Sequence, residues 1–357
     1  GRPRYSVSIL FKSGVPMQHK TFFWFFLPMA LAMLVFIAFP MVSVVMQSFL
    51  TPVEAVLVEV ETCTPFLCTT ETAIDQEATA ALREAHPLGR FAGLEIYLDR
   101  GHLATSEVAT AWARSDTWGA FFGELSNLPF YRALAFTLTY TFVCTPILIA
   151  LGFAIAIGVN AVNQSMRGFL IFFSLLPMIV TPLIGSLVLF WMIDSRGVLG
   201  TFISYLADDP NLSLKASTGL MWVSLIVYGI WSSAPFAFVV FYAGLQTQPQ
   251  ETLEAARIDG ATRWQQVRYV TIPHLMPLVT FVALIQLMDN FKVFEPLIGF
   301  NAEAHAQSLS TFIFSDLSGE TLQYSSAATT SVLTILCVAI LLAPVFVRTW
   351  RDFQGKV

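Results

Sequence analysis

Charge is scarce in this sequence, and its scarcity excludes an ordinary soluble protein. Only 12% of the 357 residues are Asp, Glu, Lys or Arg, and 55% are hydrophobic. A soluble domain carries about 25% charged residues, so more apolar side chain is present than one soluble core would bury. Six stretches lack charge entirely: 21–53, 133–166, 168–193, 216–250, 269–288 and 321–347.

Each charge-free stretch is long enough for one helical crossing of a membrane. A helix needs about 20 apolar residues to cross about 30 Å of hydrocarbon, whereas the strands of a membrane β-barrel are half as long and alternate in polarity. The sequence therefore predicts an all-α integral membrane protein with six transmembrane helices. We expect them at residues 21–50 and at about 130–162, 168–193, 217–244, 274–298 and 322–347.

The chain also lacks the common catalytic motifs. Its Gly355-Lys356 pair has neither the upstream glycine nor the following Ser or Thr of a nucleotide-binding loop, and there is no His-Glu-x-x-His run or nucleophile elbow. The five histidines are scattered along the chain. We therefore expect a non-catalytic chain without a cofactor or metal of its own.

Basic residues beside the spans predict the orientation. If residues 1–20 are cytoplasmic, 11 of the 19 Lys and Arg lie inside, including three Arg in the short 245–275 loop, while 300–320 holds none. Positive charge in short loops marks the cytoplasmic side. Both termini, 1–20 and 348–357, are then cytoplasmic, and the first apolar run is too long for a signal peptide.

On this topology the polar stretch 51–129 is an extracytoplasmic insertion between the first two spans. It carries 12 acidic residues and four basic ones, and it contains Cys63 and Cys68. In an oxidising compartment these two cysteines can form a disulfide, and the alternative is a pair of free thiols in a loop. Zinc is disfavoured, because no second Cys or His pair lies at ligand spacing nearby.

The cytoplasmic loop 245–273 carries the most specific pattern. Pro249 suits a helix start, Glu254 lies near the positive end of the helix dipole, and Gly260 can end the helix with a positive φ. Ala255 and Ala256 are small enough for another surface to approach closely. An ordered loop of this length predicts a docking element, with Pro273 expected at the turn back into the membrane.

The loop resembles the Glu-Ala-Ala loop of binding-protein-dependent ABC importer permeases. The matching residues are Glu254, Ala255, Ala256, Asp259, Gly260, Ala261 and Pro273. In that family the loop forms a coupling helix, which sits in a cleft of the ATPase subunit. The resemblance implies that ATP and Mg²⁺ are bound by partner subunits.

Other segments extend the resemblance to the large permease subunit of the maltose and glycerol-phosphate systems. They are Leu27-Pro28, Gly93-Leu94-Glu95-Ile96-Tyr97, Pro129-Phe130-Tyr131-Arg132 and Trp231-Ser232-Ser233-Ala234-Pro235. The resemblance implies the fold of a type I importer permease in the bacterial inner membrane. It also implies a second permease subunit, two ATPase copies, a periplasmic binding protein and a sugar-like solute.

The resemblance further implies where the solute passes. In the maltose-type permease the contacts come from the fifth span and from the segment before the fourth-span proline. The matching positions are Ile230, Ser232, Ser233 and Phe236 with Gln286 and Asn290. Asp289 is a further candidate, because ionisable groups at membrane depth usually face a cavity or a partner, whereas Lys292 and Glu295 fit either the pathway or the interface.

Two alternatives stay open on the sequence alone. An ion-coupled secondary transporter would use Asp289 and Glu295 as cation or proton sites, but it gives no reason for the 249–273 loop. A membrane enzyme would need converging acid, base or metal ligands, which the sequence lacks. The 51–130 region fits docking of the binding protein or packing against the companion permease.

Overall fold

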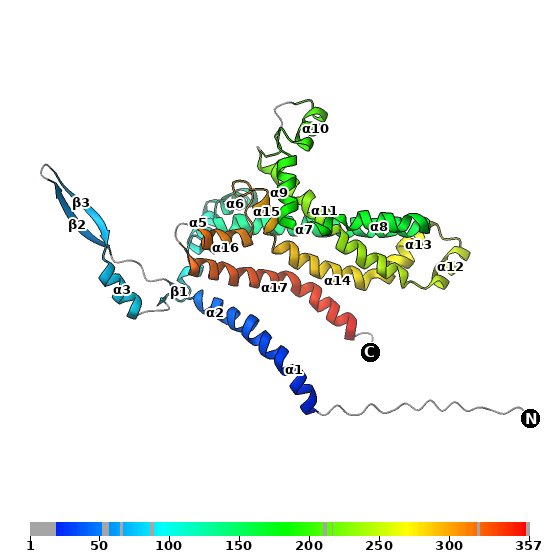
Figure 1. Cartoon of the computed structure of the whole chain (residues 1–357), viewed down its shortest axis with the longest axis horizontal. Coiled ribbons are helices and arrows are strands. Elements are labelled where there is room, and N and C mark those ends of the chain that lie inside the picture. Colours follow the sequence, from blue (N-terminus) through cyan, green and yellow to red (C-terminus); the bar gives the residue numbers. More distant parts are fainter. Residues whose placement is uncertain are drawn as a thin grey trace, which may run out of the picture. The chain divides into compact units, whose positions relative to one another are not determined.

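The computed structural model describes residues 19–51, 57–64, 67–85, 89–209, 213–215, 217–319 and 322–354, most of them in helices (Figure 1). The long apolar helices are α7 (Pro129–Ala161), α8 (Gln164–Ile179), α9 (Pro182–Met192), α11 (Thr218–Gln246), α14 (Ile272–Phe291) and α17 (Tyr324–Gln354). Shorter helices are α3 (Gln76–Ala85), α4 (Glu95–Leu98), α5 (Thr105–Arg114), α6 (Trp118–Leu125), α10 (Val198–Leu206), α12 (Gln250–Ile258), α13 (Arg263–Gln266), α15 (Glu295–Gly299) and α16 (Leu309–Ser318).

The first apolar segment forms a compact unit of its own up to residue 46. It consists of α1 (His19–Met33), the π-helical segment η1 (Leu34–Ala38) and α2 (Phe39–Gln47). In η1 the N–H of Phe39 donates to the carbonyl of Leu34, one residue further back than in an α-helix. Pro40 follows directly. A proline lacks an N–H and clashes with the carbonyl four residues earlier, so a widened turn before it relieves both problems.

The same arrangement occurs in the fifth apolar segment. There the π-helical segment η2 (Val267–Thr271) precedes Pro273, and the N–H of Ile272 donates to the carbonyl of Val267. The helix is continuous from Arg263 to Phe291. Pro273 therefore lies inside a helix and does not mark a turn, which differs from the sequence expectation. The helix also starts before residue 274 and ends at Phe291, so Asp289 and Glu295 belong to different helices, α14 and α15.

The centre of the second unit, residues 47–357, is the parallel packing of α7 against α11. Phe136 meets Trp222 near one end (ring centroids 4.9 Å apart), and Phe153 meets Phe241 further along (5.9 Å). Between these pairs a Cβ at Gly152 would lie 2.6 Å from the Cβ of Ala237. Only glycine permits so close an approach, as is common where membrane helices pack.

The third apolar segment is not one straight helix. Residues 168–193 were expected to form a single span, but α8 and α9 meet at 93° across Val180-Thr181. Pro182 begins α9, and a proline disfavours helical backbone at the residue before it. At 1.5 Å per residue, the 16 residues of α8 cover about 24 Å, which is short of a full crossing.

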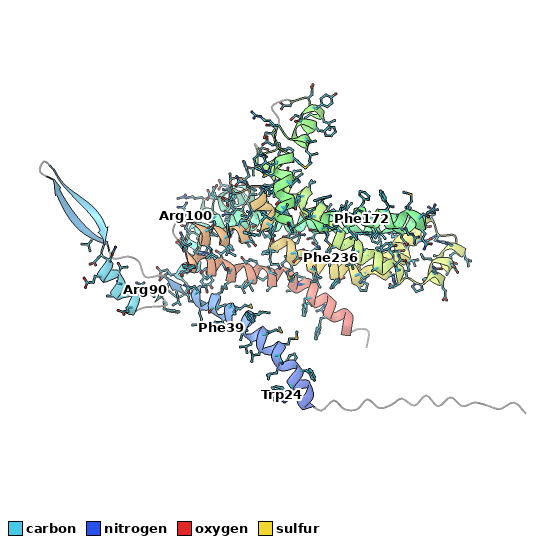
Figure 2. All side chains as sticks on the ribbon, in the orientation of Figure 1. Trp24, Phe39, Arg90, Arg100, Phe172 and Phe236 are labelled. Atoms are coloured by element: carbon cyan, nitrogen blue, oxygen red, sulfur yellow. The ribbon has the colours of Figure 1, made fainter. Side chains whose placement is uncertain are left out.

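The remaining expected spans match long helices. By length and composition, five described helices can cross a membrane, and a sixth crossing results if the bent α8–α9 pair counts as one. Large apolar side chains cover their outer surfaces, for example Phe169, Phe172 and Phe173 of α8, each at least half exposed (Figure 2). A helix that exposes such a surface is suited to lipid or to a partner in the membrane.

Residues 47–128 contain all the strands among the described residues. Strand β1 (Leu50–Thr51) pairs with β4 (Arg90–Phe91), and β2 (Leu57–Thr64) pairs with β3 (Leu67–Ile74), both antiparallel. Ser48, just before β1, connects this region to the helical bundle. Tyr97 donates to the hydroxyl of Ser48 (2.7 Å), and Thr329 of α17 donates to the carbonyl of Ser48 (3.2 Å).

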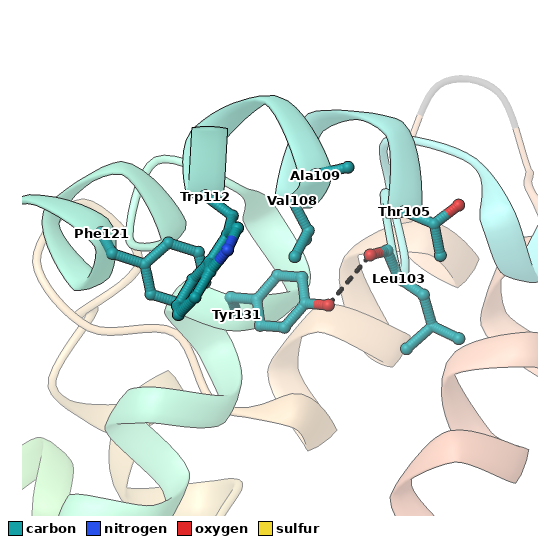
Figure 3. Close-up of a pocket in the computed structure, with 7 residues that line it drawn as sticks. All are labelled: Leu103, Thr105, Val108, Ala109, Trp112, Phe121 and Tyr131. Carbon is teal, nitrogen blue, oxygen red and sulfur yellow. Dashed lines mark hydrogen bonds between the residues drawn. The ribbon is translucent and has the colours of Figure 1, made fainter. Parts of the chain in front are cut away.

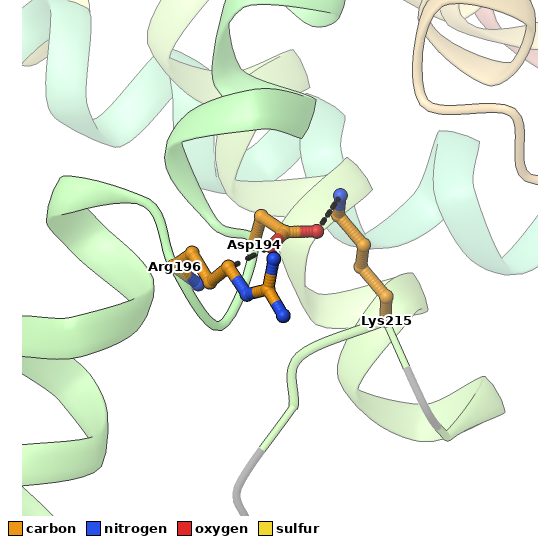
Figure 4. A network of polar contacts seen from close by, with 3 residues as sticks. All are labelled: Asp194, Arg196 and Lys215. Carbon is orange, nitrogen blue, oxygen red and sulfur yellow. Dashed lines mark hydrogen bonds and ion pairs between the residues drawn. The ribbon is translucent and has the colours of Figure 1, made fainter.

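An ion pair closes the loop between α9 and α11. Lys215 Nζ lies 2.8 Å from Asp194 Oδ2 and 3.5 Å from the centre of the Phe190 ring, and Asp194 also accepts from the Arg196 N–H (Figure 4). The hydrogen bond from Lys215 holds the pKa of Asp194 below its ordinary value. The pair fixes the base of the turn that leads into α10.

Candidate functional site

Helix α12 is an exposed element at the surface of the helical bundle. It contains no buried residue, and the side chain of Ile258 is 87% exposed. Figure 1 shows α12 and α13 at one end of the bundle, opposite α5, α6 and α16. A short helix that buries nothing gains little from tertiary packing, which usually supplies most helical stability. Its order must come from its ends.

The C-terminal end of α12 is closed by a Schellman motif. Gly260 has φ +78°. Its N–H donates to the carbonyl of Arg257 (3.0 Å), and the N–H of Ala261 donates to that of Ala256 (2.9 Å). These are the two bonds that define the motif. A left-handed residue is required at position 260, as expected from the sequence, because only there does the chain turn back onto the last helical carbonyls.

The next helix begins at once with a capping box. The hydroxyl of Thr262 accepts from the N–H of Gln265 (3.4 Å), and the side chain of Gln265 accepts from the N–H of Thr262 (2.7 Å). The amide of Gln266 also donates to the carbonyl of Ala261 (2.8 Å). The turn between α12 and α13 is therefore hydrogen-bonded on both sides and has a defined shape.

Side chains connect this loop to the membrane helices. The amide of Gln248 lies 3.4 Å from the hydroxyl of Thr271, and Thr247 lies 3.4 Å from the ring of His274. On the other side, Gln246 donates to the side chain of Asn160 at the end of α7 (3.3 Å). The residues before α12 are thus bonded to both the second and the fifth apolar segments.

The exposed side chains between Glu251 and Tyr269 define a surface that we call the coupling surface. It mixes charge with large apolar groups: Trp264 is 68% and Tyr269 67% exposed. These two aromatic residues were not predicted, although aromatic residues in a polar loop are a recognisable signal of an interface. Among its exposed residues are Glu251, Glu254, Ala255, Arg257, Ile258, Asp259, Gly260, Arg263, Trp264 and Tyr269.

The predicted coupling residues all lie on or next to this surface. Glu254, Ala255, Asp259 and Gly260 are exposed, and Ala256 and Ala261 are half-buried. Pro273 is exposed near the start of α14, inside the helix that is continuous from Arg263. The structure brings the first six together within α12 and its terminal turn.

The predicted pathway residues of α11 share one side of that helix. Ser232, Ser233 and Phe236 are partly buried, as is Ile230, and they surround the buried Pro235. Ser232 donates to the carbonyl of Gly229 (3.2 Å).

The predicted pathway residues of α14 divide into two kinds. Gln286 and Asn290 are 4% and 5% exposed, and Asn290 donates to the hydroxyl of Thr145 on α7 (3.0 Å). Asp289 is half exposed and pairs with Lys292 at 3.6 Å. Among the hydrogen bonds of the described residues, none joins the α11 group to the α14 group, so the structure does not assemble a single polar cluster from the two.

A cavity of about 380 Å³ lies between α5, α6 and the start of α7 (Figure 3). Its walls are mainly apolar, and Tyr131 donates across it to the carbonyl of Leu103 (2.9 Å). Trp112 and Phe121 stack edge-on at its rim, with ring centroids 5.3 Å apart. This cavity was not predicted from the sequence.

A second polar contact near the start of α17 was also not predicted. The ring of His102, 2% exposed, meets the carbonyl of Ser326 at 3.2 Å, and Ser326 donates to Asp316 (2.7 Å). Burial raises the pKa of Asp316, while the hydrogen bond from Ser326 opposes this.

Across the described part of the chain, His, Cys, Asp and Glu side chains form no group of three or more that could hold a metal ion.

Long apolar helices packed into a bundle, with an exposed and hydrogen-bonded polar loop at one end, are the architecture of a helical membrane protein. The sequence profile of the binding-protein-dependent transport system inner membrane component family matches residues 117–351. The chain belongs to this family.

Three curated relatives show how far the similarity extends. The probable ABC transporter permease protein y4oQ of Sinorhizobium fredii is 30% identical over 176 residues, which cover 48% of this chain and 55% of the relative. The galactooligosaccharides transport system permease protein GanP of Bacillus subtilis is 27% identical over 259 residues (69% and 60%). The trehalose transport system permease protein SugA of Mycobacterium tuberculosis is 25% identical over 266 residues (74% and 82%). The chain thus matches little more than half the length of the first two.

Solved structures agree on the fold. A chain of a bacterial ABC transporter that imports the acidic polysaccharide alginate has a TM-score of 0.58 at 21% identity, covering 77% of this chain and 96% of that one. A chain of the alginate transporter bound to its pentasaccharide-loaded periplasmic protein gives 0.55 at 20% identity, covering 76% and 93%. The predicted fold, a helical membrane permease of the type I importer class, is confirmed.

The Schellman motif gives a direct test of the loop. A Cβ at Gly260 meets nothing within 4 Å, so Gly260→Ala adds only the cost of a left-handed alanine, about 1–2 kcal/mol. We expect hydrogen exchange at the N–H groups of residues 260 and 261 to accelerate by roughly 5- to 30-fold, because 1.4 kcal/mol is a factor of ten.

Gly260→Asn is the matched control, since asparagine tolerates the left-handed conformation. It should retain most of the protection against exchange. Equal exchange rates in the alanine variant, the asparagine variant and the parent chain would show that the turn does not order α12.

Proposed function

We propose that this chain is a permease subunit of an ATP-driven importer and that the coupling surface docks an ATPase subunit. The observation that carries the proposal is α12: an ordered helix with no buried residue and an 87% exposed isoleucine at its end. A fixed turn on an otherwise unpacked helix is what a docking element needs, because little ordering entropy is then lost on binding.

The connections of the loop suggest how movement passes into the membrane. The residues just before α12 are hydrogen-bonded to two other segments: Gln248 to Thr271, directly before α14, and Gln246 to Asn160, at the end of α7. A displacement of α12 would therefore move the cytoplasmic ends of α14 and α7. The rigid Gly260–Thr262 turn prevents α12 from moving alone. We infer that closure of the ATPase subunits shifts α12, α14 and α7 together and changes access to the pathway.

ATP and Mg²⁺ belong to the partner subunits in this proposal, and the chain itself catalyses no reaction. Family membership supports this division, because the family comprises membrane components of binding-protein-dependent transport systems. The complete assembly would contain a second permease subunit, two ATPase copies and a periplasmic binding protein in the bacterial inner membrane. GanP and SugA are named as transport system permeases for galactooligosaccharides and trehalose, which supports a sugar or sugar-like solute.

Family membership also favours the importer over an ion-coupled transporter. The structure gives the alternative little support, since Asp289 pairs with Lys292 at the exposed end of α14 and Glu295 begins another helix.

Both termini are cytoplasmic in the proposed orientation, and residues 51–129 face the periplasm. The α12–α13 end then lies inside, and α5, α6 and α16 lie outside, which agrees with their positions at opposite ends of the bundle (Figure 1). We propose that the acidic 51–129 insertion contacts the binding protein.

For the pathway we propose that Ser232 and Ser233 contact the solute from α11, beside Ile230 and Phe236. Pro235 removes a backbone hydrogen bond there, which leaves a carbonyl free to face a polar cavity. Gln286 and Asn290 are the candidates on α14, where the bond from Asn290 to Thr145 holds α14 against α7. Asp289 borders the outer end of the pathway in this proposal.

The substitution Ile258→Asp tests the docking surface. Because Ile258 is exposed in the isolated chain, the change should leave stability nearly unaltered. If the ATPase subunit buries this side chain, about 1.5–3 kcal/mol of apolar burial is lost. We expect the ATPase subunit to bind roughly 10- to 150-fold more weakly, measured as its retention on the affinity-purified complex across a dilution series.

Val198→Asp is the matched control: Val198 is 76% exposed on α10, on the proposed outer side. It should leave ATPase retention unchanged. Equal loss in both variants, or in neither, would contradict the assignment of the coupling surface.

A second prediction concerns the pathway. Ser233→Leu removes a hydroxyl and adds bulk, so binding-protein-dependent uptake should fall about tenfold or more, since one hydrogen bond contributes about 1 kcal/mol and the larger side chain narrows the passage.

Ser224→Leu serves as its control, because Ser224 lies nine residues away on the opposite side of α11 and is similarly half-buried. Uptake of radiolabelled solute into proteoliposomes, with ATPase retention checked in parallel, separates the two. A normal uptake rate in Ser233→Leu would remove this residue from the pathway.

A further inference from the structure

The β2–β3 hairpin carries both cysteines of the 51–129 insertion. Its register pairs Cys63 directly with Cys68, and Thr64 with Leu67 one step closer to the turn. The sequence alone shows only that four residues separate the cysteines. The register adds that the two backbones lie side by side at these positions.

This placement satisfies the geometric requirement for a disulfide. Directly opposed residues of an antiparallel pair have Cα atoms about 4.5–5.5 Å apart. Disulfides connect residues whose Cα atoms are about 4.4–6.8 Å apart. The hairpin therefore needs no backbone rearrangement to be bridged at this pair.

Among the described residues, β2 and β3 form a sheet with each other alone. An isolated two-stranded hairpin is marginally stable at best in water. Small elements without a hydrophobic core commonly depend on a covalent link, and residues 57–74 are mostly Glu, Thr and small apolar residues.

We propose that Cys63 and Cys68 form an intramolecular disulfide that closes the β2–β3 hairpin. The inference rests on the proposed function for its compartment, because the periplasm is oxidising. The two thiols lose two protons and two electrons as the S–S bond forms. The electrons reduce the disulfide of a periplasmic thiol–disulfide exchange protein to a dithiol. Cys144 and Cys337, in α7 and α17, remain free thiols.

The bridge closes a ring of six residues at the turn. In the chain-entropy description, such a ring shifts the balance between formed and unformed hairpin by roughly 40-fold. The hairpin and the residues just after it carry five acidic groups and no Lys or Arg: Glu59, Glu61, Glu71, Asp75 and Glu77. The disulfide would thus hold the hairpin that carries these acidic residues in a fixed shape.

Thiol counting in the whole complex tests the proposal. Membranes are denatured in excess maleimide-linked polyethylene glycol, with and without prior reduction, and additions are counted by gel shift. We expect two additions before reduction and four after it. Cys63→Ser should give three in both conditions, and the Cys63→Ser/Cys68→Ser double variant two in both. Reduction should also speed proteolytic nicking within residues 57–74 by up to about 40-fold.

Two results would overturn the disulfide. One is four additions without reductant, and the other is a dimer on a non-reducing gel that disappears in Cys63→Ser, which would show a bond between chains. Binding-protein-stimulated ATP hydrolysis is measured on the same membranes. Four free thiols with normal stimulation overturn the disulfide alone. Free thiols together with a coupling surface accessible from the outer side would overturn the proposed topology as well.

Discussion

Every membrane segment of this protein is shaped by one requirement: in hydrocarbon, no water pairs a peptide N–H or carbonyl, so each segment must satisfy its own backbone. Helices do so along their whole length, except at prolines. At three of the prolines the described chain changes its helix geometry, in one of two ways. Before Pro40 and Pro273 the helix widens by one residue into a π turn and continues. Before Pro182 it breaks, and α8 and α9 meet at 93°.

The same requirement explains the contrast between the two ends of the bundle. Inside the membrane segments, packing supplies the order, as where Gly152 lets α7 and α11 approach to backbone contact. At the α12 end packing is nearly absent, and hydrogen bonds at the helix termini replace it. Gly260 and Thr262 cap adjacent helices within three residues. The loop is therefore rigid and still exposed, which is the combination that a docking element needs.

The sequence predicted the features that depend on local chemistry. Charge-free runs located the membrane segments, and Gly260 indicated the end of α12. The hydropathy of a segment does not show in which direction its helix axis runs, so the bend at residues 180–181 was not predicted, although Pro182 was a visible signal. Hydropathy also extended the fifth span beyond Phe291, because residues 293–300 remain largely apolar after the helix has ended.

What the sequence could not supply are contacts between distant residues. Asn290 donates to Thr145, which is 145 positions away, and nothing in the sequence indicated this contact. Gln248 lies in the turn between α11 and α12 and Thr271 lies in η2, and no pattern in either segment indicates that they pair. For Cys63 and Cys68 the sequence supplied part of the answer. Their spacing left both a disulfide and two free thiols open, and only the register of the hairpin showed that the two residues lie opposite each other.

The most direct measurement of the central claim is the accessibility of residue 258 in membrane vesicles. An Ile258→Cys variant is treated with a membrane-impermeant maleimide, with the parent chain as background. The account predicts no labelling in right-side-out vesicles, weak labelling in inverted vesicles with the ATPase subunits bound, and strong labelling once they are stripped off. Labelling from the outer side, or labelling in inverted vesicles that does not change when the ATPase is removed, would contradict it.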